Sequence, residues 1–160
     1  RIAVPLLAVA ALAGCSPSSS TAAVVDGRAI SEQELTTAFD ACREFGDGIS
    51  RNETLFYLVT GRIVDIVGEQ AGMPVDEAMF TSQLAQNPQA APILGTACEP
   101  VLLGNAKLLY LQRQMDPVAV ATVTPNIDVT FNPRYGSWDW QVGLIPEGGS
   151  ISVPEGGARS

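Results

Sequence analysis

The residues of this chain with the clearest chemistry are its three cysteines, and the chain contains no histidine. Without histidine, the sequence excludes catalytic triads with an imidazole base and HExxH metalloproteases. No glycine-rich nucleotide loop occurs, and neighbouring carboxylates such as Asp76 and Glu77 stand where helices start. The sequence therefore predicts no catalytic residue, no metal site and no cofactor, and it favours binding over enzymatic functions.

Cys15 ends an apolar segment at the start of the chain. Arg1 precedes a short apolar run, and residues 12–15, Leu-Ala-Gly-Cys, resemble a bacterial lipobox. In that class of signals the cysteine is lipidated and the chain is cut before it. We therefore expect residues 1–14 to be a signal peptide and residues 15–21 a tether. The lipid on Cys15 would anchor the protein to the outer face of the bacterial cytoplasmic membrane. The alternative is an ordinary signal peptide with an incidental cysteine.

Cys42 and Cys98 remain as an even pair once Cys15 is lipidated. In an exported protein such a pair predicts a disulfide. The two residues lie 56 positions apart, so the bond would close a long loop. Two buried free thiols are the alternative.

The charge balance limits the class of partner. The chain has a formal net charge of −8, and 46% of its residues are hydrophobic. An acidic surface repels the phosphates of nucleic acids, so no nucleic-acid partner is expected. The apolar fraction is sufficient for one domain with its own core.

Three patterns of the capping-box type, Ser/Thr-x-x-Glu, begin at Ser31, Ser50 and Thr96. They predict helices that end near residues 45, 70 and 115, and a weaker helix follows Asp76. Residues 22–30 predict a hairpin with a turn at Asp26-Gly27, and residues 127–131 alternate as a strand. The expected fold class is mainly α, a small helical bundle with a short N-terminal β-hairpin, a C-terminal strand and an irregular tail. The expected segments are a helical domain over 22–116, a strand and aromatic extension over 117–145 and a flexible Pro/Gly tail over 146–160.

Two helices carry apolar faces that bear on function. The helix over 51–70 has one broad apolar face, with Leu58 on its polar side. The helix ending near Met115 has two apolar faces, which Lys107 and other polar residues separate. Such a helix is either buried on both sides or offers one face to a ligand. Trp138 and Trp140 are candidates for docking a partner or for packing against the helices.

The segment Ala23-Val24-Val25-Asp26-Gly27-Arg28-Ala29-Ile30-Ser31, leading into a capped helix, resembles the N-terminal domain of SurA and PrsA-type foldases. The order of the later helices fits the same domain. The resemblance implies that the helices hold unfolded or exported polypeptides. Many such foldases also contain a prolyl-isomerase domain with histidines, for which there is no room between Met115 and Ile127. Isomerase activity is therefore not expected.

The leading hypothesis is a lipid-anchored, chaperone-like protein outside the cytoplasm, which shields apolar side chains of its clients. The candidate client-binding residues are Phe39, Phe56, Leu58, Leu108, Leu111 and Met115. The competing hypothesis is an envelope scaffold that binds one folded partner through Trp138 and Trp140. Residual prolyl-isomerase activity is the one concrete enzymatic alternative.

Overall fold

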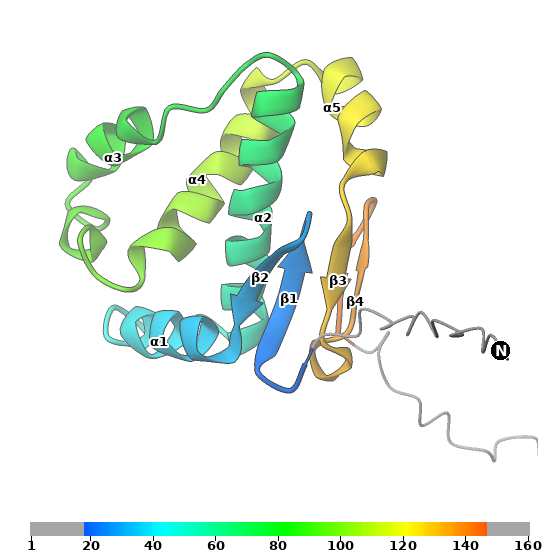
Figure 1. Cartoon of the computed structure of the whole chain (residues 1–160). Helices are drawn as coiled ribbons and strands as arrows, with labels where there is room; N and C mark the ends of the chain where they lie inside the picture. Colours follow the sequence, from blue (N-terminus) through cyan, green and yellow to red (C-terminus); the bar gives the residue numbers. More distant parts are fainter. Residues whose placement is uncertain (1–17, 147–160) are drawn as a thin grey trace, which may run out of the picture.

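The computed structural model describes residues 18–146. The expected signal peptide, Cys15 and the tail after residue 146 lie outside the described residues. Within them, no helix is long and apolar enough to cross a membrane. The mainly helical class that the sequence predicts is confirmed, with strands near both ends of the described chain (Figure 1). The helices are α1 (Glu32–Arg43), α2 (Arg51–Gln70), α3 (Glu77–Ala85), α4 (Glu99–Gln114) and α5 (Pro117–Val123), and the strands are β1 (Thr21–Val25), β2 (Arg28–Ser31), β3 (Val129–Phe131), β4 (Ser137–Asp139) and β5 (Gly143–Ile145).

Two small antiparallel sheets lie beside the helices. The predicted hairpin is confirmed as β1 and β2, and Asp26 and Gly27 form its turn with positive φ angles of 48° and 75°. β3 pairs with the other edge of β1, which places Val24 opposite Thr130 and gives the strand order β2-β1-β3. β4 and β5 form a separate two-stranded sheet.

The pairing of β3 with β1 brings part of the expected segment over 117–145 against the helices. Phe131 and Tyr135 belong to the same hydrophobic core as α1 and α2. The described part of the expected tether is also bound to this core region. The Asn132 amide donates to the carbonyl of Thr21 at 3.0 Å, and Arg134 donates to the carbonyl of Ser19 at 2.9 Å.

The helix starts follow the predicted caps at two of three places. Ser31 accepts from the backbone N–H of Glu34 at 3.0 Å, and Ser50 and Glu53 form a complete capping box. The third helix begins later than expected, at Glu99, with Cys98 as its N-cap. The Thr96 hydroxyl instead accepts from Cys98 N at 3.2 Å within the preceding turn. Thr96 and Glu99 have the spacing of a capping box, but residues 96–99 form a turn before the helix, so Thr96 is not the N-cap.

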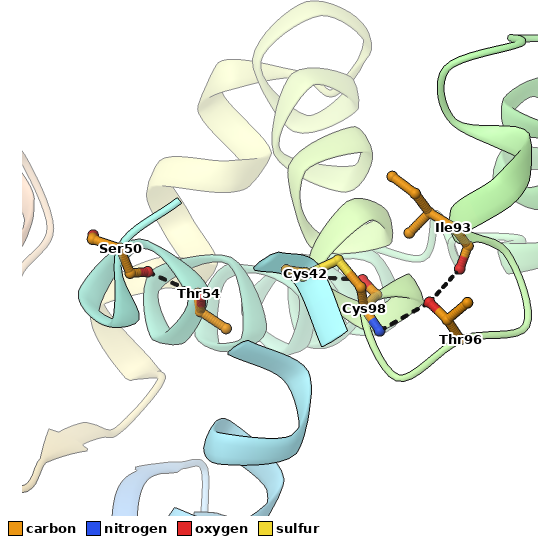
Figure 2. Close-up of a disulfide and its surroundings, with 6 residues drawn as sticks. All are labelled: Cys42, Ser50, Thr54, Ile93, Thr96 and Cys98. Atoms are coloured by element: carbon orange, nitrogen blue, oxygen red, sulfur yellow. Dashed lines mark hydrogen bonds between the residues drawn. A yellow bond between two sulfur atoms is a disulfide. The ribbon is translucent and has the colours of Figure 1, made fainter. Parts of the chain in front are cut away.

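The disulfide between Cys42 and Cys98 is confirmed (Figure 2). It joins the last turn of α1 to the N-cap of α4, with the two Cα atoms 4.8 Å apart. Both cysteines are buried. The bond therefore fixes the N-terminal end of α4 against the body of the molecule.

α2 lies at the centre of the fold, next to α4, with α3 and the strands on opposite sides of this pair (Figure 1). The side of α2 that the periodicity predicts to be polar is buried instead, at Thr54, Leu58, Gly61 and Gly68. Gly68 lies against Met73 and Val75, and Gly61 faces Gly104 of α4. The two helices approach closely at Gly61, where a Cβ would come within 3.2 Å of the Gly104 Cα. The helical periodicity gave one apolar face, but this helix has neighbours on nearly all of its sides.

Candidate functional site

An apolar cleft of about 520 Å³ lies between α2, the C-terminal half of α4, α5 and the β4–β5 hairpin. Its volume lies within the range of ordinary ligand sites. No charged side chain contributes to its lining. The cleft lining includes six residues that the sequence analysis singled out, namely Phe56, Leu108, Leu111, Met115, Trp138 and Trp140.

Two of the candidate client-binding residues do not line the cleft. Leu58 is a buried core residue beneath α4, so its expected place on an accessible polar face is wrong. Phe39 lies on α1, where the Arg43 guanidinium sits 5.8 Å from the centre of its ring. Met115 lines the cleft but is itself buried, as part of the wall. The binding of clients by these residues stays a prediction.

The two tryptophans form one wall of the cleft together with Phe56. The Trp138 ring stacks between Phe131 and Phe56, with centroids 5.9 Å and 6.0 Å away. Trp140 meets Trp138 edge-on at 5.6 Å and is exposed at the rim. Trp138 is therefore largely a packing residue, and Trp140 presents its ring to the outside.

The β4–β5 hairpin carries both tryptophans into this wall, and the sequence analysis did not predict it. The Asp139 side chain accepts from the backbone N–H groups of Gln141 and Val142 at 2.8 Å and 3.0 Å and so forms the turn. Gly143, with a φ of 89°, lies against the Phe56 ring, where a Cβ would come within 3.0 Å of the ring. The signal in the sequence was an Asp-containing turn between two short segments, one aromatic and one aliphatic.

Sequence reasoning also missed Thr60 and the exposed Val142, which line the same cleft. Val142 is 75% exposed, at the tip of the hairpin. Thr60 is 4% exposed, and its hydroxyl has no hydrogen-bond partner among residues 18–146. The same is true of the buried indole nitrogen of Trp138. Unpartnered buried polar groups are rare because each one carries a desolvation penalty.

The opposite side of the α2–α4 pair contains a buried lysine. Lys107 donates to Asp65 Oδ2 and Glu77 Oε2, each at 2.9 Å. Its expected role as a polar separator on the helix surface is wrong, because α3 brings Glu77 over it. Burial lowers the pKa of Lys107, but the two carboxylates outweigh burial and hold this pKa above its ordinary value. The side chain is therefore a charged structural link and not a neutral nucleophile.

A second polar cluster joins α1, α2 and the turn after β3. The Tyr135 hydroxyl donates to Glu32 Oε2 at 2.7 Å, and Arg51 donates to the same carboxylate oxygen at 3.1 Å. Burial raises the pKa of Tyr135, so its phenol stays protonated at neutral pH. Within the described part of the chain, no three acidic, cysteine or histidine residues are grouped so that they could hold a metal ion. This cluster positions structural elements around the core.

The sequence and the fold were compared with known proteins. No family model matches the chain, and neither a curated protein nor a solved structure matches it. The cleft is therefore the feature of the molecule that bears most directly on function.

Proposed function

We propose that this protein binds apolar segments of unfolded or exported polypeptides in the cleft, without prolyl-isomerase chemistry. The observation that carries this proposal is an uncharged, open cleft whose lining is mostly aliphatic and aromatic. A charged ligand would lose its hydration there without gaining a partner of opposite charge. An apolar segment would bury its own surface together with that of the lining.

The rim of the cleft extends this apolar surface outward. Trp140 and Val142 are exposed on the hairpin, beside the opening. Solvent-exposed apolar groups around a pocket are typical of surfaces that bind other molecules. Aliphatic and aromatic contacts without fixed charges give weak and sequence-tolerant binding, as a protein with many clients requires.

The membrane location is part of the same proposal. It is supported by the lipobox-like residues that end at Cys15 and by the resemblance of residues 23–31 to SurA and PrsA-type foldases. The disulfide between Cys42 and Cys98 fits an oxidising compartment outside the cytoplasm. Cys15→Ala is expected to move the protein from the membrane fraction of bacterial cells to the soluble fraction. Retention of this variant in the membrane fraction would contradict the lipid anchor.

The binding activity is tested by suppression of aggregation. The full chain, with its disulfide intact, is added at rising ratios to two unrelated aggregating reporter proteins, and light scattering is followed. We expect suppression by the wild-type chain and its loss in Val142→Glu, which places a charge at the rim of the cleft. The matched control is Val118→Glu, because Val118 is 73% exposed on α5 but does not line the cleft.

Equal suppression by the two variants would contradict the cleft as the binding site. Absence of suppression by the wild-type chain at several-fold excess would contradict the chaperone-like function. That result would favour an envelope scaffold, for which a pull-down is expected to give one stoichiometric partner.

A further inference from the structure

We propose that the cleft recognises an uncharged peptide segment through hydrogen bonds from Thr60 and Trp138 to the peptide's backbone carbonyls. This inference rests on the proposed function and specifies its ligand. Most of the remaining lining is aliphatic or aromatic, with Gln112, Thr124 and Gln141 as further uncharged polar residues, but the Thr60 hydroxyl and the Trp138 indole nitrogen are the buried polar atoms of the lining that lack a partner among residues 18–146. An indole N–H can only donate, and a hydroxyl can donate as well as accept. The ligand must therefore present acceptors among apolar groups, as a chain of leucine- or phenylalanine-rich polypeptide does.

The Thr60 hydroxyl takes no part in the hydrogen bonds that hold the described residues together. On the same helix and also buried, Thr54 donates its hydroxyl to the Ser50 carbonyl one turn earlier, at 3.0 Å (Figure 2). This is the ordinary way in which a helical threonine satisfies its side chain. Thr60 makes no such bond within the described chain. Thr54 and Thr60 are thus both buried on α2, but only the Thr54 hydroxyl has a hydrogen-bond partner among the described residues.

Access to the two groups requires movement of one wall of the cleft. The Thr60 hydroxyl and the Trp138 indole nitrogen are both shielded from solvent in the structure. The β4–β5 hairpin is the wall that carries Trp138; its two strands pair only with each other, and it is held to the rest of the fold by side-chain packing, as of the Trp138 ring on Phe131 and Phe56. An isolated two-stranded hairpin is marginally stable by itself. A peptide that enters between this hairpin and α2 would exchange two unpartnered polar atoms for two hydrogen bonds.

The absence of charge in the lining distinguishes a peptide from a fatty acid or another anion. No lysine or arginine in the cleft could pair with a carboxylate. The whole chain is acidic, with a net charge of −8, and repels anionic ligands at long range. An uncharged lipid tail fits the apolar lining, but it would leave Thr60 and Trp138 without acceptors. The peptide is therefore the ligand class that satisfies both kinds of group.

The test compares Thr60→Val with Thr54→Val in the full chain. Valine has nearly the shape of threonine without the hydroxyl. Binding of the blocked, uncharged peptide Ac-SLFLS-amide is followed by tryptophan emission, because both tryptophans of the chain line the cleft. We expect Thr60→Val to weaken binding about fivefold, which corresponds to the loss of one hydrogen bond, and to raise the midpoint of thermal unfolding. Thr54→Val is expected to leave binding unchanged and to lower the midpoint, because its hydroxyl has a partner.

Thr60→Val is expected to weaken peptide binding and to raise the midpoint of thermal unfolding. A variant that is merely destabilised would therefore not reproduce the expected result. Unchanged peptide affinity in Thr60→Val would overturn the inference but leave the proposed function standing. Failure of the wild-type chain to bind the peptide would overturn the proposed function as well. Binding of dodecyl maltoside in place of the peptide would overturn the peptide as ligand class. The peptide Ac-SLELS-amide is expected to bind about tenfold more weakly, because its buried carboxylate finds no partner, and equal binding would contradict an uncharged site.

Discussion

The two halves of α4 show how one helix serves structure and binding. Residues 98–107 are held by the disulfide at Cys98, by the close approach of Gly104 to α2 and by the ion pairs of Lys107. Residues 108–115 line an open, uncharged cleft through Leu108, Leu111 and Met115. Lys107, the buried polar side chain of the first half, has two carboxylate partners. The Thr60 hydroxyl and the Trp138 indole nitrogen, which belong to the cleft lining, have no partner among residues 18–146.

This difference indicates where the protein has room for a ligand. In the first half, Cys98 and Lys107 hold α4 to other helices, so a change there is expected to lower stability. In the second half, apolar surface and unpartnered donors remain, so a change there is expected to alter binding. The following predictions separate the two halves by these two readouts.

The largest effect on stability is expected from removal of the disulfide. Cys42→Ser with Cys98→Ser should lower the free energy of unfolding by about 4 kcal/mol, because the bond closes a long loop in the unfolded chain. Denaturant unfolding measures this loss. Peptide binding at low temperature should persist, because the cysteines do not line the cleft. A loss of binding in the folded variant would show that the two halves of α4 are coupled.

The next largest effect is expected at Lys107. Asp65→Asn with Glu77→Gln should lower the free energy of unfolding by about 3 kcal/mol, because a buried ammonium group would lose both of its counter-charges. Lys107→Met should lower it less. The side chains of Asp65 and Glu77 are 43% and 61% exposed, so water can hydrate them without the lysine. Equal losses in the two variants would contradict this account of the ion pairs.

A smaller effect is expected where α4 meets α2. A Cβ at Gly104 would overlap the carbonyl oxygen of Tyr57. Gly104→Ala should therefore lower the free energy of unfolding by about 2 kcal/mol, as overpacking of a core does. Gly61→Ala is the matched control, because its Cβ contact is only moderately tight and alanine favours a helix. A larger loss for Gly61→Ala than for Gly104→Ala would be inconsistent with the packing described.

The smallest effect concerns the N-terminal cap of α2, the helix that packs against α4. Hydrogen bonds from the side chain and backbone of Ser50 hold the pKa of Glu53 below its ordinary value of 4.5. The ionised carboxylate stabilises the fold above about pH 4.5, and this stabilisation is lost as the pH falls through the lower, folded-state pKa. The free energy of unfolding of Glu53→Gln should therefore fall less steeply with acidification than that of the wild-type chain. Parallel pH profiles would contradict this role of the capping box.

Local patterns predicted much of the fold because their causes are local. The caps at Ser31 and Ser50, the Asp26-Gly27 turn and the strand that ends at Phe131 depend on neighbouring residues. The disulfide was predicted from the even pair of cysteines that remains if Cys15 is lipidated. Six of the eight residues proposed for client binding and docking also proved to line one cleft, since apolar positions at the end of α4 have no other cover.

The errors arose where distant elements decide the outcome. Leu58 lies on the less apolar side of α2, but α4 covers that side. Lys107 is buried because Asp65 and Glu77 come from two other helices to pair with it. The strands of the β4–β5 hairpin have three residues each, too few for an alternating pattern to stand out. Helical periodicity and short-range motifs contain no information about such partners.

The most direct test of the central claim is photo-crosslinking of the full chain with a diazirine-bearing form of Ac-SLFLS-amide, followed by mass spectrometry. The account predicts crosslinks within residues 56–64, 108–115 and 138–143, which line the cleft. Unlabelled peptide should compete for them. Crosslinks confined to the other exposed apolar surface, around Met79 and Leu109 on α3 and α4, would contradict the claim that this cleft is the binding site.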